Sequence, residues 1–163
     1  MSIVLFRVDE RLIHGQVVVG WGTRLHPDRI VVVDDVLAAA SWEQELYTFG
    51  LPGEVDASFE TVDSARALLP EWRSGTDKLI VLTRDVATMR RLAAGGALRG
   101  DEVNIGGLHH APGRVPVLPY VYLSPEETSA LRALVADGVD VSARDVPSSR
   151  RVTVDEILRD AAR

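Results

Sequence analysis

Seven short apolar or β-branched runs, separated by segments with helix-start signals, constrain the fold of this chain more than any other feature. Each run is bounded by charged residues, glycine or proline, and the runs cover 2–6, 30–33, 55–59, 79–82, 103–105, 117–122 and 139–141. Runs of this length and composition predict buried strands. Their regular alternation with helical segments predicts β-α-β units, which place consecutive strands parallel to one another.

The helical segments between the runs carry recognisable N-terminal signals. Ser124-Pro-Glu-Glu127 combines a capping serine, a proline in the first helical position and a capping-box glutamate. Further starts are predicted at 41–44, 61–64, 83–85 and 153–156, and a helix of modest propensity is predicted over 15–24. We therefore expect an α/β fold: one domain over 1–163, with an open, mostly parallel sheet and helices on both faces.

Composition excludes several classes of protein. The 163 residues can bury a core without cross-links, and the absence of cysteine is typical of a reducing compartment. No apolar run approaches the roughly 18 residues of a membrane span, so a cytoplasmic protein is expected. The net charge of −6 disfavours general nucleic-acid binding, which needs a basic face.

Residues 7–16, Arg-Val-Asp-Glu-Arg-Leu-Ile-His-Gly-Gln, follow the first predicted strand and hold the strongest chemical signal. His14 falls where the strand gives way to a helix, a place where free N–H groups bind anions. Imidazole is nucleophilic near neutral pH, and the guanidinium groups of Arg7 and Arg11 can grip phosphate oxygens in pairs. These residue types favour a phosphohistidine, although a surface or core histidine is the common alternative.

Asp9 is expected beside His14, where its carboxylate can orient the imidazole and fix its tautomer. An ion pair of purely structural purpose with Arg7 or Arg11 is an equally good interpretation. The sequence does not separate a phosphate clamp from a partner contact for either arginine. Gly15 and Gln16 complete the group of residues expected to bind phosphate or contact a partner.

Weaker candidates lie at other predicted strand ends and loops. Asp34 and Asp35 follow the second strand, where capping of the next helix is the favoured role. Gly106 and Gly107 indicate backbone passing close to a ligand or partner, or a simple turn. Ser148 lies in a predicted loop, and Trp21 is interpreted as a core or interface anchor rather than a platform for sugar stacking.

A metal site is not expected. His109 and His110 are adjacent, without the helical spacing of a zinc motif and without cysteine support. We expect no cofactor.

The string from Arg7 to Val17, followed by Gly20-Trp21, resembles the N-terminal active-site signature of the mannose/fructose/sorbose family of phosphotransferase-system IIB subunits. Further blocks at 31–35, 103–107 and 146–147 resemble the same family in order, so the resemblance spans the chain. It implies that a phosphorylated IIA protein or domain donates its phosphoryl group to His14. It also implies transfer onward to a sugar that enters through IIC/IID membrane subunits.

Two other functions compete with this one. A IIB-like phosphoprotein that signals without sugar transport would share the same signature. A histidine phosphatase is a weaker alternative, because Leu12 and Ile13 separate Arg11 from His14 where an Arg-His-Gly string would be needed. The sequence leaves open whether the chain forms a homodimer.

Overall fold

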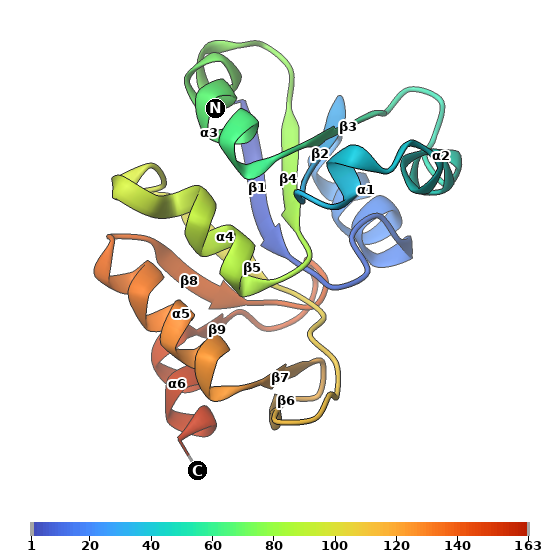
Figure 1. Ribbon diagram of the computed structural model, residues 1–163. Coiled ribbons are helices and arrows are strands. Elements are labelled where there is room, and N and C mark those ends of the chain that lie inside the picture. Colours follow the sequence, from blue (N-terminus) through green and yellow to red (C-terminus); the bar gives the residue numbers. More distant parts are fainter. Residues whose placement is uncertain (1, 163) are drawn as a thin grey trace.

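The computed structural model describes residues 2–162 and shows a seven-stranded sheet with helices on both faces (Figure 1). The sheet order is β3-β2-β4-β1-β5-β8-β9, and every neighbouring pair is parallel except β8 and β9. The strands of this sheet are β1 (Ile3–Val8), β2 (Arg29–Val33), β3 (Asp56–Glu60), β4 (Leu79–Thr83), β5 (Glu102–Ile105), β8 (Asp140–Ala143) and β9 (Val152–Thr153). The expected α/β fold, with a mostly parallel open sheet, is confirmed.

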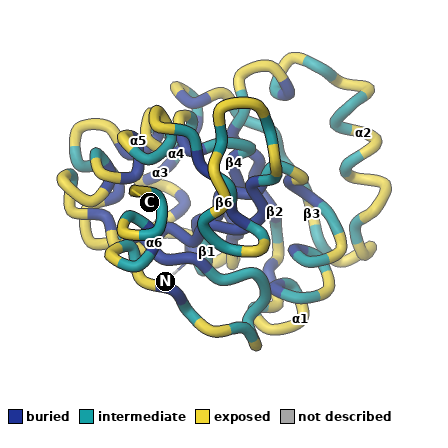
Figure 2. The backbone as a smooth tube through the Cα atoms, turned by 90° about the horizontal axis from the view of Figure 1, so that it is seen from below, coloured by how far each residue is buried: buried dark blue, intermediate teal, exposed yellow. Residues whose placement is uncertain are grey.

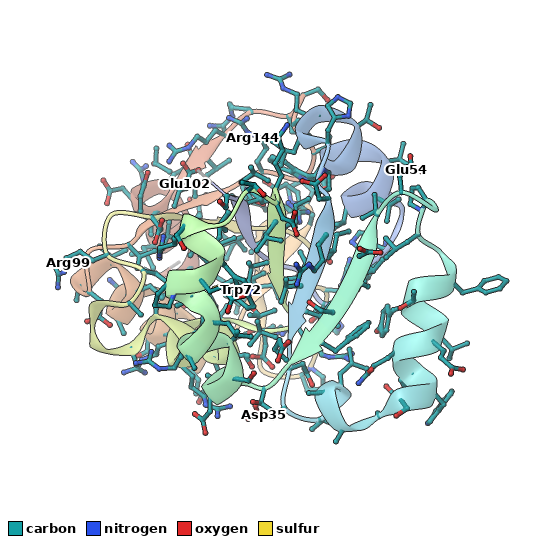
Figure 3. The ribbon with its side chains drawn as sticks, turned by 90° about the horizontal axis from the view of Figure 1, so that it is seen from above. Asp35, Glu54, Trp72, Arg99, Glu102 and Arg144 are labelled. Atoms are coloured by element: carbon teal, nitrogen blue, oxygen red, sulfur yellow. The ribbon has the colours of Figure 1, made fainter. Side chains whose placement is uncertain are left out.

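Alternate residues of the central strands feed two separate apolar cores, because successive side chains of a strand point to opposite faces. On β4, Leu79 and Val81 enter one core and Ile80 and Leu82 enter the other. The first face is covered by α3 (Val62–Ser74), α4 (Val86–Ala93), α5 (Pro125–Ala136) and α6 (Val154–Ala161). Trp72 is buried where α3 packs against the sheet (Figure 3).

The second face is covered by a smaller layer. It consists of the π-helical η1 (Gln16–Trp21), α1 (Gly22–Leu25), the 3₁₀ turn η2 (Leu37–Ala39) and α2 (Ser41–Phe49). The helix expected over 15–24 is therefore divided into two segments, the π-helical η1 and the short α-helix α1. Three glycines and a run of valines lie in this stretch and favour an α-helix weakly, and no side chain caps its start.

The prediction of one strand over 117–122 is wrong. It forms an antiparallel hairpin of β6 (Val115–Leu118) and β7 (Val121–Leu123), outside the main sheet (Figure 1). The chain turns back at Pro119-Tyr120, so the two halves of the apolar run pair with each other. A proline is typical of a turn and cannot donate to a ladder of hydrogen bonds.

Helices begin at all five sites indicated by the sequence signals, and a side chain caps the helix at four of them. The side chains of Thr61, Ser124 and Thr153 each accept a hydrogen bond from a backbone N–H three residues on. Ser41 caps nothing, because α2 begins after Ala40 without a side-chain cap. At 83–85 the cap is Asp85, whereas Thr83 is the last residue of β4. A short 3₁₀ turn, η3 (Ala94–Gly96), follows α4.

Candidate functional site

His14 lies in the loop between β1 and η1, at the carboxyl end of the central strand. Its side chain is 15% exposed, while Nε2 is buried and lies 3.0 Å from Oδ2 of Asp9. That separation is an ion-pair distance, but the two groups are not aligned as a hydrogen bond. The Nε2 edge of the ring therefore faces the carboxylate in the protein interior.

Asp9 is fully buried and contacts both His14 and Arg7. Its Oδ2 accepts hydrogen bonds from Nε and Nη2 of Arg7, at 3.2 and 3.0 Å, and its Oδ1 accepts from the backbone N–H of Arg11 at 3.1 Å. Burial alone would raise the pKa of Asp9, but the contact with His14 and the charge of Arg7 hold the pKa below its usual value. Asp9 is thus an anion facing the imidazole at neutral pH.

Arg7 is also fully buried, and every one of its N–H groups is engaged. Besides the two bonds to Asp9, Nη1 donates to Oδ1 of Asn104 and, at 2.8 Å, to the carbonyl of Arg144. Nη2 donates to the carbonyl of Asp145 at 3.0 Å. Burial lowers the pKa of Arg7, an effect that Asp9 opposes. A guanidinium has five N–H donors, so Arg7 keeps none for a phosphate.

Gly106 is where the backbone comes closest to this buried pair. A Cβ atom at this position would collide with the guanidinium of Arg7. At the next residue, the Gly107 carbonyl accepts a hydrogen bond of 2.9 Å from the N–H of Glu10. The glycine pair therefore brings the end of β5 against the arginine and the loop of β1, a close approach that only glycine permits at Gly106.

The loop that carries His14 has an uncommon backbone. Leu12 has φ of 56°, in the left-handed region that favours glycine, and its side chain is fully buried. The N–H of Leu12 bonds to the carbonyl of Asp9 at 3.0 Å, which closes a tight turn. Strain of this kind costs about 1–3 kcal/mol and persists where the surroundings fix it, as burial does here.

The surface beside His14 offers a second arginine and free backbone donors. Arg11 is exposed, and among residues 2–162 its guanidinium pairs with no carboxylate. The N–H groups of His14 and Gly15 donate no hydrogen bond to another described residue, whereas the His14 carbonyl accepts from Val17 and Val18 at 3.0 and 2.9 Å. Gln16 is half-buried at the start of η1. A positive charge and open donors thus face solvent around the imidazole.

Residues 3–163 match the family model of the sorbose subfamily IIB component of the phosphotransferase system. The chain is 31% identical to the N-acetylgalactosamine-specific phosphotransferase enzyme IIB component 1 of Escherichia coli, over 92% of this chain and 94% of that protein. It is 28% identical to the fructose-specific EIIB component of Bacillus subtilis, with 100% and 99% covered. Its fold matches the IIBSor domain of the sorbose permease of Klebsiella pneumoniae with a TM-score of 0.86, at 26% identity and 98% coverage of both chains.

This chain belongs to the sorbose subfamily of phosphotransferase-system IIB components. The resemblance inferred from the motif is confirmed. IIB components of this family take a phosphoryl group from IIA and pass it to a sugar by way of IIC and IID, so the chain is a transferase component of sugar uptake. Within residues 2–162 no helix is long and apolar enough to cross a membrane.

A loop at 144–149 completes the site of this IIB component. Its Asp145 carbonyl accepts from Nε1 of Trp21 at 3.1 Å as well as from Arg7, and Val146 lies against Gly20 of η1. Trp21 is buried, with the Arg7 guanidinium 5.4 Å from its ring, and is a core anchor as expected. Ser148 is exposed on the same loop and reaches neither Arg7 nor His14 by any hydrogen bond within residues 2–162.

Asp34 and Asp35 lie at the same edge of the sheet, at the end of β2. Oδ1 of Asp34 accepts from the N–H of Leu37 at 2.8 Å, and Oδ1 of Asp35 accepts from the N–H of Val62 at 2.9 Å. The backbone of Val62 together with Arg91, 2.9 Å away, lowers the pKa of Asp35. Asp34 therefore bonds the start of η2, the next helical turn, whereas Asp35 bonds the start of the more distant α3.

His109 and His110 turn toward different partners. Nδ1 of His109 lies 2.9 Å from Oε2 of Glu10, whereas the ring of His110 packs edge-on against Tyr122. Arg114 pairs with both Glu10 and Glu127, joining the loop after β5 to the start of α5. Within residues 2–162 no three histidine, cysteine or acidic side chains gather as metal ligands would.

The sequence interpretation gave no role to several groups that the structure places at the site. Asn104 lies inside the block 103–107, yet only the fold reveals that its side chain binds Arg7. The carbonyls of Arg144 and Asp145 carry no side-chain signal at all. Glu10, although part of the motif, had no assigned task, and the structure gives it a contact with Arg114 and His109.

Proposed function

We propose that His14 is the residue that carries the phosphoryl group, and that Nδ1 is the atom that accepts it. The observation that carries the proposal is the burial of Nε2 against Asp9. An anion beside Nε2 favours the tautomer with its proton on Nε2, which leaves the Nδ1 lone pair for phosphorus. The P–N bond of the donor phosphohistidine breaks as the bond to Nδ1 forms, and the donor imidazole keeps the electron pair. Asp9 then stabilises the positive charge that the His14 ring gains.

We assign different tasks to the two arginines. Arg7 is a positioning residue, since its five hydrogen bonds fix Asp9 and the surrounding loops. Arg11 is exposed and free, so it is the candidate to hold the phosphate oxygens, together with the N–H groups of His14 and Gly15. Gln16 is a further polar neighbour. Phosphoryl transfer of this kind depends chiefly on positioning and charge stabilisation.

In the transport cycle, this chain acts in the cytoplasm between a phosphorylated IIA protein and the IIC and IID membrane subunits. The proposed acceptor is partly exposed, between exposed Arg11 and Gly15, where two large partners can cover it in turn. The matched proteins are transport components and give no support to the signalling or phosphatase alternatives. Phosphate release from small esters would favour a phosphatase, and phosphorylation without any sugar phosphorylation would favour signalling.

The test is intact mass after incubation with phosphorylated IIA. Wild type should gain one acid-labile phosphoryl group, and His14→Gln should gain none while keeping its circular-dichroism spectrum. His110→Gln is the matched control and should be labelled like wild type. Phosphorus NMR of the labelled protein should report the Nδ1 isomer. A label on any other histidine, or labelling of His14→Gln, refutes the assignment.

A further inference from the structure

The negative charge of the chain is concentrated in one segment of its sequence. Residues 30–65 contain eight of the 24 carboxylates and no lysine, arginine or histidine, so their formal charge is −8. The other residues contain 18 basic and 16 acidic side chains and are slightly positive. Asp35, at the end of β2, and Glu54, before β3, are both in this segment (Figure 3). In space, Asp34 and Asp35 pair with Arg84 and Arg91, and Asp63 lies on α3 of the other layer. The carboxylates around α2 that form no ion pair with a described residue include Glu43, Glu45 and Glu54.

Helix α2, in the middle of that segment, presents an exposed apolar stripe. Trp42, Leu46 and Phe49 are spaced four and three residues apart, so they lie on one face of the helix. They are 67%, 64% and 93% exposed, and none of the residues of α2 is buried (Figure 2). A helix normally turns its apolar stripe to the core, so this stripe lacks a partner within residues 2–162.

The stripe continues to the phosphorylation loop. A hollow of about 410 Å³ is lined by Ile13, which precedes His14, and by Trp42, Leu46 and Tyr47 of α2. Ile13 and Tyr47 also belong to the same apolar core. A protein that covers His14 can therefore extend over α2 without a gap. The rim of the hollow includes Glu43, and neither Glu43 nor Glu45 forms an ion pair with a described residue.

We propose that α2 and its acidic surroundings dock onto the cytoplasmic loops of the IIC/IID membrane subunits, an inference that rests on the function proposed above. Cytoplasmic loops of membrane proteins carry an excess of lysine and arginine, so their charge complements Glu43, Glu45 and Glu54 beside the stripe. Trp42, Leu46 and Phe49 supply the apolar centre, where aromatic anchors dominate binding.

The same charges disfavour two other occupants. A cytoplasmic bilayer surface is itself negative and repels the unpaired carboxylates of Glu43, Glu45 and Glu54. A second copy of this chain would bring two sets of these carboxylates together through a two-fold interface, which like charges oppose.

The test separates binding from phosphorylation. Two α2 variants are tested: Trp42→Ser with Phe49→Ser, and Glu43→Lys with Glu45→Lys. Their controls are Val135→Ser on α5 and Glu71→Lys on α3, both at exposed helix positions. Unphosphorylated protein is sedimented with inverted vesicles that hold the IIC and IID subunits of the same system, and with vesicles that lack them. Sugar phosphorylation is followed as a function of IIB concentration, and transfer from phosphorylated IIA is followed in solution.

Both α2 variants should bind vesicles at least tenfold more weakly and raise KM for the IIB protein at least tenfold. The controls should match wild type, and transfer from IIA to His14 should stay within twofold in all four proteins. The proposal is overturned if the α2 variants bind vesicles as wild type does, or if their transfer from IIA falls as much as their vesicle binding. It is also overturned if wild type binds vesicles that lack the subunits, or if the variants convert a dimer into a monomer. Failure of wild type to be phosphorylated at His14 would refute the function instead, because sedimentation needs no phosphate.

Discussion

At the residue scale, the site consists of a buried ionic pair beneath a partly exposed imidazole. Arg7 and Asp9 are removed from water, which is costly unless each donor and acceptor finds a partner. Here strand ends and loops distant in sequence provide those partners, from Asn104 and the 144–145 carbonyls. The pair fixes the carboxylate against Nε2 of His14, and Arg7 keeps no N–H group for a further ligand.

Arg7→Lys should destabilise the protein much more than Arg11→Lys. Lysine keeps the charge but has three donors, so at least two charge-assisted hydrogen bonds are lost, each worth about 1.5–3 kcal/mol. We expect the free energy of unfolding in urea to fall by about 3 kcal/mol or more for Arg7→Lys, and by less than about 0.5 kcal/mol for exposed Arg11→Lys. Arg11→Lys should instead slow transfer from IIA about tenfold. Equal stability of the two variants would contradict the division of tasks.

Gly106→Ala tests the close approach of β5 to the arginine. The added methyl group collides with the guanidinium, and overpacking of this kind costs about 1–3 kcal/mol. The midpoint of urea unfolding should decrease, and transfer should slow because Asp9 moves with Arg7. Gly53→Ala is the control, since a Cβ there meets nothing within 4 Å. An unchanged midpoint for Gly106→Ala would contradict this, because it would show that the loop accommodates the methyl group without loss of stability.

At the scale of elements, the helices of this protein differ in the capping and packing that stabilise them. Helix α5 has a complete capping box, in which Ser124 and Glu127 each accept the other's backbone N–H. Helix α2 has neither a side-chain cap nor a buried residue. Most helical stability comes from packing of an apolar face, so α2 depends less on the core than α5 does.

Ser124→Ala should lower the free energy of unfolding by about 1 kcal/mol, the usual cost of losing an N-cap. Ser41→Ala is the matched change in α2 and should have an effect of less than about 0.5 kcal/mol, because Ser41 caps nothing. Urea unfolding followed by circular dichroism measures both. A comparable loss for Ser41→Ala would mean that its hydroxyl stabilises the start of α2.

At the scale of the whole molecule, the sheet brings the carboxyl ends of β1, β2, β4 and β5 to one edge, and His14 lies there. One side of the sheet is a deep helical layer with the larger core, and the other holds η1 and α2 (Figure 1). The loop of His14 and helix α2 thus lie on the same side of the sheet.

Transfer from phosphorylated IIA to His14 should be unaffected by EDTA, with rates within twofold. Phosphoryl transfer between histidines involves no nucleotide polyphosphate whose charge a divalent ion must neutralise. His109→Ala with His110→Ala should alter stability or partner affinity more than the chemistry, since their partners are Glu10 and Tyr122. Stoichiometric metal in the purified protein, with activity lost on chelation and restored by zinc, would contradict this.

The sequence by itself determined the order of the elements, the parallel sheet and the place of His14 at a strand end. These features follow from local signals, namely apolar runs, capping residues and a continuous motif. Only the tertiary structure decided that Arg7 is buried and that 117–122 folds back as a hairpin. The structure also decided that α2 keeps its apolar stripe exposed. Those outcomes depend on which distant segments come into contact. The distant partners of Arg7 are the amide side chain of Asn104 and the backbone carbonyls of Arg144 and Asp145, which are 97, 137 and 138 residues away. No local sequence pattern encodes such contacts.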